Sequence, residues 1–122
     1  SYICTSSENH EGKMPVAIMM DDCYERLRDR VKFVTEVWSG TFEDYSTKHF
    51  VNRLNFSKIS DTTFELESNF LVLHTNVEGR SEVLVSGVYS DLISIKDGEA
   101  RYKSKMAILD DIATSRYLVY PI

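Results

Sequence analysis

The sequence predicts an α+β fold in which one long antiparallel β-sheet packs against helical structure. The main observation is a run of apolar, alternating segments at residues 64–77, 80–96 and 99–110, separated by the dipeptides Glu78-Gly79 and Asp97-Gly98. An Asp-Gly pair between such segments is typical of a tight hairpin, because both central residues of that turn need a positive φ angle. The second observation is a helical spacing of apolar residues over residues 23–38. These residues are Cys23, Leu27, Val31, Val34 and Trp38.

The two turns also predict the register of the strands. With each dipeptide as the whole loop, the facing pairs are Ile95 and Ala100, Ile93 and Tyr102, Tyr89 and Met106, Gly87 and Ile108, Val72 and Val85, Phe70 and Gly87, and Phe64 and Ile93. Side chains alternate between faces along a strand, so all of these residues fall on one apolar face. A slip of one residue would destroy this face, so the agreement of two turns supports the register. Phe70, Gly87 and Ile108 would lie side by side, with the glycine leaving room for the ring.

The opposite face of these strands is polar at one end and apolar at the other. Its charged residues are Glu65, Glu67, Arg101, Lys103 and Lys105. Its apolar residues are Leu71, Leu73, Val77, Leu84, Val88, Ala107 and Leu109. A face open to water is polar throughout, so we expect the apolar half to be covered by more of this chain or by another subunit. The candidates for an interface are Leu71, Leu73, Leu84, Val88 and Leu109.

The remaining segments are assigned from their composition. Residues 2–4 are expected to end a strand, 5–12 to form a polar loop and 14–20 to form an edge strand, where Pro15 is tolerated. Asp21-Asp22 suit a helix start, because acidic groups stabilise a helix N-terminus. The charged run along this helix is expected to be solvated or to line an interface. Residues 41–47 are predicted as a loop, 48–59 as a strand, 112–117 as a connector and 117–122 as an apolar tail.

Length and composition limit the classes of protein that fit. The 122 residues suffice for a single domain, 1–122, with 43% hydrophobic and 27% charged residues. A net charge of −5 gives no reason to expect nucleic-acid binding, which calls for a basic patch. We find no apolar run of membrane-spanning length and no signal peptide, and we expect a cytoplasmic protein with two free thiols, Cys4 and Cys23.

The sequence holds few patterns that indicate chemistry. The glycines are scattered singly, so no phosphate-binding loop is predicted. His10, His49 and His74 show no ligand spacing to each other or to the cysteines, and we expect no metal or cofactor on this chain. Cys23, on the helical stripe, is expected to be packed in the core rather than to act as a nucleophile.

One group of polar residues interrupts the apolar face of the sheet. The group comprises Ser68, His74, Asp91 and Ser104, near Tyr89 and Tyr102. A carboxylic acid on an apolar concave sheet could act as a general base, because burial raises its pKa toward neutrality. In the alternative interpretation, Asp91 hydrogen-bonds Ser104 and its neighbours, or a β-bulge turns it outward. The bends that form a cup come from such bulges, so the strict pairing could fail near Asp91.

Several segments resemble one protein family along most of the chain. They are Asp21-Asp22, Leu27-Arg28-Asp29-Arg30-Val31, His49-Phe50-Val51-Asn52, Asn69-Phe70-Leu71-Val72, Glu78-Gly79-Arg80, Gly87-Val88-Tyr89-Ser90-Asp91 and residues 101–110. Together they are similar to the small (β) subunit of aromatic-ring-hydroxylating dioxygenases, from about residue 14 to the C-terminus. The resemblance is spread over the chain rather than concentrated in one motif.

The resemblance implies a cone-like fold of the NTF2 and SnoaL type, with a long curved sheet wrapped on helices. It also implies a large (α) subunit that carries a Rieske 2Fe–2S cluster and a mononuclear iron. The small subunit would form the trimeric base of an α3β3 assembly without catalytic residues, and the large subunit would select the aromatic substrate. Members of the family begin with helices that close the cone. On this alignment we expect this sequence to start after them; the alternative is a shifted alignment.

Two functional hypotheses and a weaker third follow. The first is a non-catalytic structural subunit of such a dioxygenase, in which Arg26, Arg28, Arg30, Lys103 and Lys105 make rim contacts at most. The second is a stand-alone isomerase, cyclase or dehydratase of the same superfamily. Its base would be Asp91, helped by Tyr89, Tyr102 or His74. The third is a ligand-binding module without chemistry.

Overall fold

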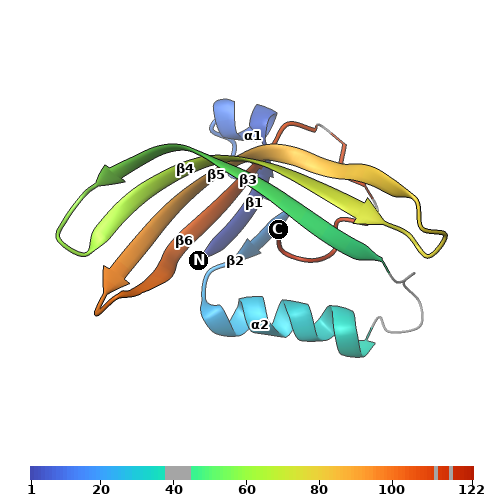
Figure 1. The fold of residues 1–122 in the computed structure, drawn as a ribbon, viewed down its shortest axis with the longest axis horizontal. Coiled ribbons are helices and arrows are strands. Elements are labelled where there is room, and N and C mark those ends of the chain that lie inside the picture. Colours follow the sequence, from blue (N-terminus) through green and yellow to red (C-terminus); the bar gives the residue numbers. More distant parts are fainter. Residues whose placement is uncertain (38–44, 112, 116) are drawn as a thin grey trace.

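The computed structural model describes residues 1–37, 45–111, 113–115 and 117–122, and it forms one curved six-stranded sheet with short helices (Figure 1). The elements are β1 (Tyr2–Ser6), α1 (Ser7–Glu11), β2 (Met19–Asp21), α2 (Tyr24–Lys32) with a π-helical turn (Phe33–Val37), β3 (Ser46–Lys58), β4 (Thr63–Thr75), β5 (Ser81–Lys96) and β6 (Glu99–Leu109). The strand order is β2-β1-β6-β5-β4-β3. Only the β1–β6 pairing is parallel among the described strands, so the sheet is mixed and the predicted α+β class is confirmed.

The β5–β6 turn forms as the Asp-Gly pair predicts. Asp97 and Gly98 both adopt positive φ angles, 53° and 79°. The pairs Ile95–Ala100 and Ile93–Tyr102 follow in the predicted register.

The β4–β5 turn differs from the prediction, although the pairs it predicted are observed. The Asn76 amide donates to the Arg80 carbonyl, so the loop is one residue longer than Glu78-Gly79. A bulge in β5 at Leu84 compensates for this extra residue, and Val72–Val85, Phe70–Gly87 and Phe64–Ile93 therefore pair as predicted.

The Leu84 bulge changes which face of the sheet Leu84 and its neighbour Val83 lie on. Leu73 faces Val83 instead of Leu84, so Leu84 turns into the core and Val83 lies on the outer face. Leu84 was therefore wrongly placed on the outer face, because a bulge inverts the alternation of side chains beyond it.

A second bulge, in β6 at Lys103, shifts the pairing of β5 with β6 by one residue from the predicted register. Ile93 faces Tyr102, whereas Leu92 faces Ser104. The predicted pairs Tyr89–Met106 and Gly87–Ile108 are wrong, and Tyr89 faces Ala107 while Gly87 faces Leu109. Lys105, Ala107 and Leu109 therefore lie on the inner face with Tyr89, not on the outer face.

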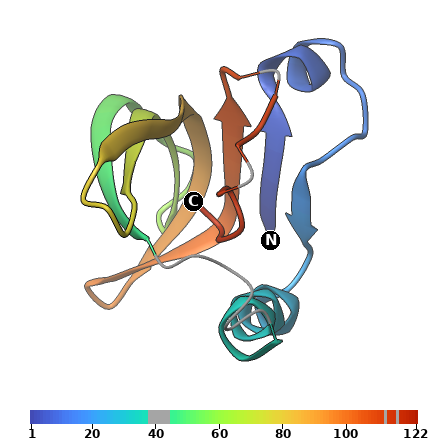
Figure 2. The ribbon, with the colours of Figure 1, turned by 90° about the vertical axis from the view of Figure 1, so that its right-hand side faces the viewer.

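The core lies in the hollow of the curved sheet. Its buried residues are Tyr2, Cys4, Met19, Phe70, Val72, Leu84, Val85, Tyr89, Ala107, Leu109, Leu118 and Ile122. Gly87 sits at the closest approach, because a Cβ there would clash with the Ile108 carbonyl and touch the Phe70 ring. The C-terminal segment lies within the curve of the sheet (Figures 1 and 2), where the Ile122 amide donates to the Tyr2 hydroxyl at 3.1 Å.

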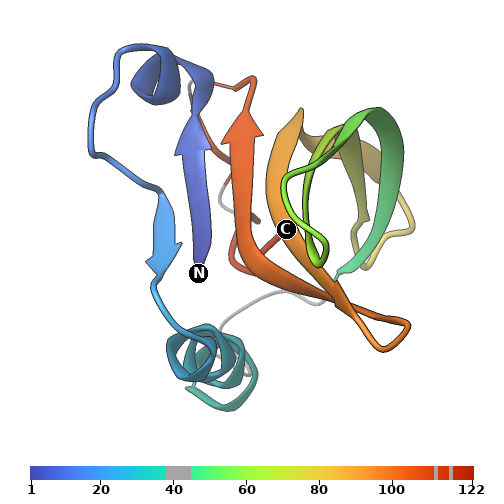
Figure 3. The same ribbon diagram turned by 90° about the vertical axis from the view of Figure 1, so that its left-hand side faces the viewer.

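The helices cover little of the sheet, as the two side views show (Figures 2 and 3). The predicted helix is confirmed as α2, which begins at Tyr24 with Cys23 as its N-cap residue. Asp21-Asp22 precede this start rather than form it, and the prediction that Cys23 packs in the core is wrong, because Cys23 is exposed. Asp21 instead ends β2 and holds the helix through Arg30, whose Nε and Nη2 donate to its two carboxylate oxygens at 2.7 and 3.2 Å. The predicted stripe ends in Trp38, which lies outside the described residues.

The N-terminal residues are more structured than predicted. The expected strand end at residues 2–4 is confirmed as β1, but the predicted loop 5–12 contains α1, which Ser6 Oγ caps by accepting from the Asn9 amide. Within the predicted strand 14–20, pairing with β1 is limited to Met19 and Met20, in β2. The predicted strand 48–59 is confirmed as β3, which forms an edge of the sheet and buries none of its side chains.

Candidate functional site

The predicted site at Asp91 is a buried ion pair. Asp91 on β5 and Lys105 on β6 face each other across the strands, and Asp91 Oδ2 lies 3.6 Å from Lys105 Nζ. The Asp91 side chain is almost fully buried, and its Oδ1 atom has no hydrogen-bond partner among the described residues. Lys105 comes to this position because of the Lys103 bulge, which confirms the prediction that the strict pairing fails near Asp91.

Aromatic rings form the surroundings of this pair. Lys105 Nζ lies 3.2 Å from the centroid of the Tyr89 ring and 5.2 Å from that of Tyr102. The Tyr89 ring in turn stacks on Phe70, with centroids 4.0 Å apart. A desolvated ammonium is attracted to the faces of aromatic rings, so the tyrosines stabilise Lys105 in this apolar position.

Burial shifts the protonation of each member of this group. It raises the pKa of Asp91, and the Lys105 ammonium opposes that shift. Burial also lowers the pKa of Lys105, against the charge of Asp91. The pKa of Tyr89 is raised by burial and by the Asp91 carboxylate. A carboxylate that is paired with a buried ammonium is a poor base, because protonating it would leave the lysine without its counter-charge.

The other predicted site residues do not converge on Asp91. Ser104 faces Leu92 on the outer side of the sheet, so the alternative in which it bonds Asp91 is wrong, and the bulge does not turn Asp91 outward. Ser68 is buried opposite Tyr89. His74 lies near the far end of β4, where its ring stacks on Tyr117 with centroids 4.9 Å apart. Its Nδ1 atom is buried without a hydrogen-bond partner among the described residues.

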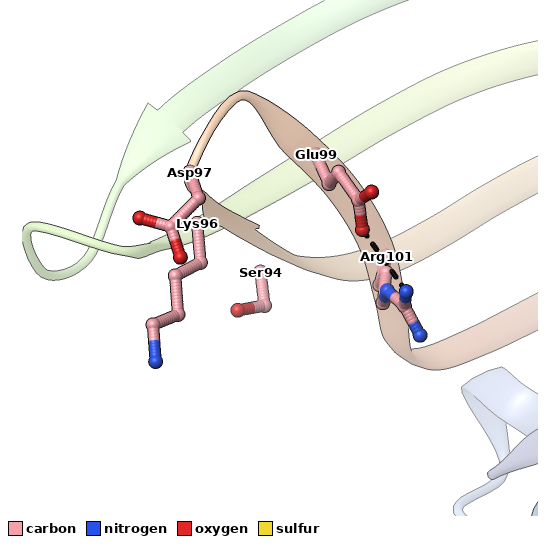
Figure 4. A pocket seen from close by; sticks show the side chains of 5 residues that line it. All are labelled: Ser94, Lys96, Asp97, Glu99 and Arg101. Carbon is pink, nitrogen blue, oxygen red and sulfur yellow. Dashed lines mark hydrogen bonds and ion pairs between the residues drawn. The ribbon is translucent and has the colours of Figure 1, made fainter.

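The larger hollows lie on the surface. One of about 410 Å³ opens beside the β5–β6 turn and is lined by Ser94, Lys96, Asp97, Glu99 and Arg101. Figure 4 shows Arg101 bonded to Glu99, at 2.9 Å, and Lys96 pointing away from them, so the charges do not converge on a ligand. Another, of about 460 Å³, is a mainly apolar groove beside α1, β1 and β2.

The interface candidates separate into two groups. Leu71, Leu73 and Val88 lie half-buried on the outer face, as predicted, whereas Leu84 and Leu109 belong to the core. Val83, which the sequence reasoning missed, takes the outward position of Leu84 and is 61% exposed. An interface role for the outward residues stays a prediction.

The described part of the chain was compared with the requirements of a metal site and of a membrane-spanning helix. No three histidine, cysteine or acidic side chains there come together as metal ligands. None of the described helices is long and apolar enough to cross a membrane.

Comparison with known proteins decides the family. The model of the ring hydroxylating beta subunit matches residues 2–115 of the chain. This chain belongs to the ring-hydroxylating beta subunit family. The match covers nearly the whole described structure.

Individual relatives agree with this assignment. The small subunit of anthranilate 1,2-dioxygenase from Burkholderia cepacia is 30% identical over 100% of this chain and 74% of its own length. A beta subunit of the terminal oxygenase component of terephthalate 1,2-dioxygenase from Comamonas sp. is 25% identical over 99% of this chain and 77% of its own.

Solved structures confirm the fold. A beta subunit assigned to an aromatic-ring-hydroxylating dioxygenase of Novosphingobium aromaticivorans superposes with a TM-score of 0.85, at 24% identity, over 99% of this chain and 75% of that one. The curved mixed sheet of this beta subunit is therefore NTF2-like, as the resemblance implied.

Proposed function

We propose that this beta subunit is the non-catalytic, structural component of an aromatic-ring-hydroxylating dioxygenase. It forms a trimeric base that holds large subunits in an α3β3 assembly. The large subunits carry the Rieske 2Fe–2S cluster and the mononuclear iron and select the substrate. The proposal treats residues 1–122 as one domain of a cytoplasmic complex.

The state of Asp91 carries this proposal. The acid that could have served as a base is held by Lys105, and His74, Ser68 and Ser104 lie elsewhere on the sheet. No free acid–base pair therefore meets in the hollow of the described sheet. Membership in the family supplies the partner, because a small subunit works with a large one.

The relatives suggest the substrate class. Two of them are subunits of dioxygenases named for terephthalate and anthranilate, which are aromatic acids. We assign an aromatic acid to the complex of this chain. The enzyme hypothesis, with Asp91 as base, is favoured by the pKa of Asp91, which burial raises, but the Lys105 ammonium opposes that shift.

Co-expression with the large subunit tests the proposal. We expect the two chains to co-purify at the native mass of an α3β3 complex, with iron bound to the large subunit. The complex, supplied with its electron donor, should oxidise terephthalate or anthranilate, and the beta subunit alone should convert neither. Turnover by the isolated chain, abolished in Asp91→Asn with the fold intact, would establish the enzyme hypothesis instead.

A further inference from the structure

Two separate apolar surfaces lie at opposite ends of the outer face of the sheet. The first, which we call the methionine groove, has a volume of about 460 Å³ over β2, β1 and β6. Its apolar lining includes Ile3, Met14, Val16, Met20 and Met106. The second, which we call the hairpin patch, lies over β3, β4 and β5. It consists of Phe50, Leu71, Leu73, Val77 and Val83.

The methionine groove is preformed in the single chain. Hydrogen bonds from the Met14 amide to the Asn9 carbonyl, at 2.9 Å, and from Thr5 Oγ1 to the Val16 carbonyl, at 2.9 Å, fix its outer wall against α1 and β1. Nevertheless, Met14 is 47% and Met20 61% exposed. Flexible methionine side chains adapt to an inserted apolar group, which suits a concave binding surface.

The hairpin patch ends in a rigid protrusion. The Asn76 side chain accepts hydrogen bonds from the amides of Glu78 and Arg80 at 3.1 and 3.0 Å, and so holds the β4–β5 turn in one conformation. Val77 in this turn is 66% exposed. A preorganised apolar tip loses little conformational entropy when it binds.

The charges beside the two surfaces are complementary. Lys13 lies at the groove, whereas Glu78 lies next to Val77 in the hairpin turn, with its Oε2 atom 3.8 Å from Arg80 Nε. Lys13 takes part in no ion pair within the described part of the chain, and the Glu78–Arg80 pair is long and open to solvent, so Glu78 remains accessible to a partner. Opposite charges at the rim would orient the two surfaces toward each other.

We infer that the hairpin patch of one chain docks into the methionine groove of a second copy of this chain. A ring of identical subunits needs two different, complementary surfaces on each subunit, whereas a two-fold dimer needs a single self-complementary surface. This inference rests on the proposed trimeric base and identifies the surfaces that close it.

Mixing two variants tests the head-to-tail contact in the full chain. Met14→Asp damages the groove, and Val83→Asp damages the hairpin patch. We expect each variant alone to be monomeric, with self-association weakened at least about tenfold, because it has lost one half of every contact. Mixed together, they should form a one-to-one dimer, since the Val83→Asp chain keeps its groove and the Met14→Asp chain keeps its patch. Native mass spectrometry reads both results.

The test includes a control variant and a second pair of variants for the case in which an aspartate variant does not fold. Val51→Asp, at a residue of the inner face that is 57% exposed, should leave the wild-type trimer intact. If either aspartate variant fails to fold, the charge pair replaces it: Lys13→Glu and Glu78→Lys should each weaken the trimer, and the double variant should restore it.

The outcomes separate this inference from the proposed function. A wild-type trimer that persists in the groove and patch variants, or variants that do not pair on mixing, overturns the inference alone. Loss of the large subunit from an intact trimer in Met14→Asp also overturns it, because the groove would then hold the large subunit. Should the wild-type chain form no trimer, alone or with the large subunit, the trimeric base itself is disproved.

Discussion

At the residue scale, the ion pair between Asp91 and Lys105 on the inner face joins β5 to β6. The Asp91 side chain is almost fully buried and that of Lys105 is 20% exposed, and each shifts the pKa of the other. Breaking such a pair costs more than replacing it, because the remaining charge stays buried without a partner.

Replacing Asp91 by asparagine should therefore destabilise the beta subunit without changing catalysis. We expect a loss of about 3 kcal/mol of unfolding free energy, measured by urea denaturation, because Lys105 keeps its charge in an apolar site. Asp91→Leu combined with Lys105→Met should recover most of that loss. Turnover per assembled complex should equal that of the wild type, and a large fall in turnover at normal assembly would contradict the structural role.

The buried thiol of Cys4 should make the free energy of unfolding depend on pH in the alkaline range. Burial raises the pKa of this thiol from 9.0 to about 11. Between these values the unfolded chain releases the proton and the folded chain keeps it, so stability is complete below about pH 9 and falls as the pH rises toward 11. The slope of this thiol is up to about 1.4 kcal/mol per pH unit. Cys4→Ala should remove it, whereas Cys23→Ala, at an exposed thiol, should leave the slope unchanged.

At the element scale, two ion pairs show how burial decides what a charge pair contributes. Arg30 holds α2 to the buried Asp21 of β2, whereas Arg26 pairs with Asp22 at 3.3 Å in the open solvent. Arg30→Met should cost about 2 kcal/mol of unfolding free energy, since it leaves a buried carboxylate unpaired and Arg30 is itself partly exposed. The matched change Arg26→Met should cost less than about 0.5 kcal/mol. Equal losses in thermal or urea unfolding would disprove the anchoring role of Arg30.

At Gly87, β5 packs closely against the backbone of β6 and the Phe70 ring. A methyl group there would meet the Ile108 carbonyl, which belongs to the backbone and cannot turn aside. Gly87→Ala should lower the unfolding free energy by about 1–3 kcal/mol through overpacking. Ser90→Ala, at an exposed position of the same strand, is the matched control and should be nearly neutral; a neutral Gly87→Ala would show that the strands can separate at this point.

The features of these elements that could be predicted from the sequence are those that depend on neighbouring residues alone. Asp97-Gly98 requires positive φ angles, so its turn and the pairs beside it could be predicted. Bulges depend on how the whole sheet curves around its core. A break in the pairing near Asp91 was therefore expected, but its exact position at Lys103 and the second bulge at Leu84 could not be predicted from nearby residues. Tyr89 and Tyr102 could be placed on the same face as Asp91, but its partner Lys105 could not, because a single bulge moved Lys105 to that face. The family resemblance rests on many short sequence matches along the chain, and these do not depend on where the bulges lie.

At the scale of the whole molecule, packing is uneven across the sheet. The core contacts β1, β6, β5 and β4, whereas β3, at the edge, has no buried side chain. Local opening follows the number of buried contacts, so one edge of the beta subunit should open far more readily than its centre.

Hydrogen exchange should measure this difference directly. Amides of β3 are expected to exchange through local opening, well before global unfolding, and those of β5, which pairs on both sides, only through global unfolding. Adding urea in small steps should accelerate exchange in β5 but change exchange in β3 little, because local opening exposes little new surface. Equal protection of β3 and β5 in the wild-type subunit, read peptide by peptide, would contradict this view. The same peptides in the assembled trimer should show whether docking at the hairpin patch, which includes Phe50, stabilises the edge strand that the isolated subunit leaves weak.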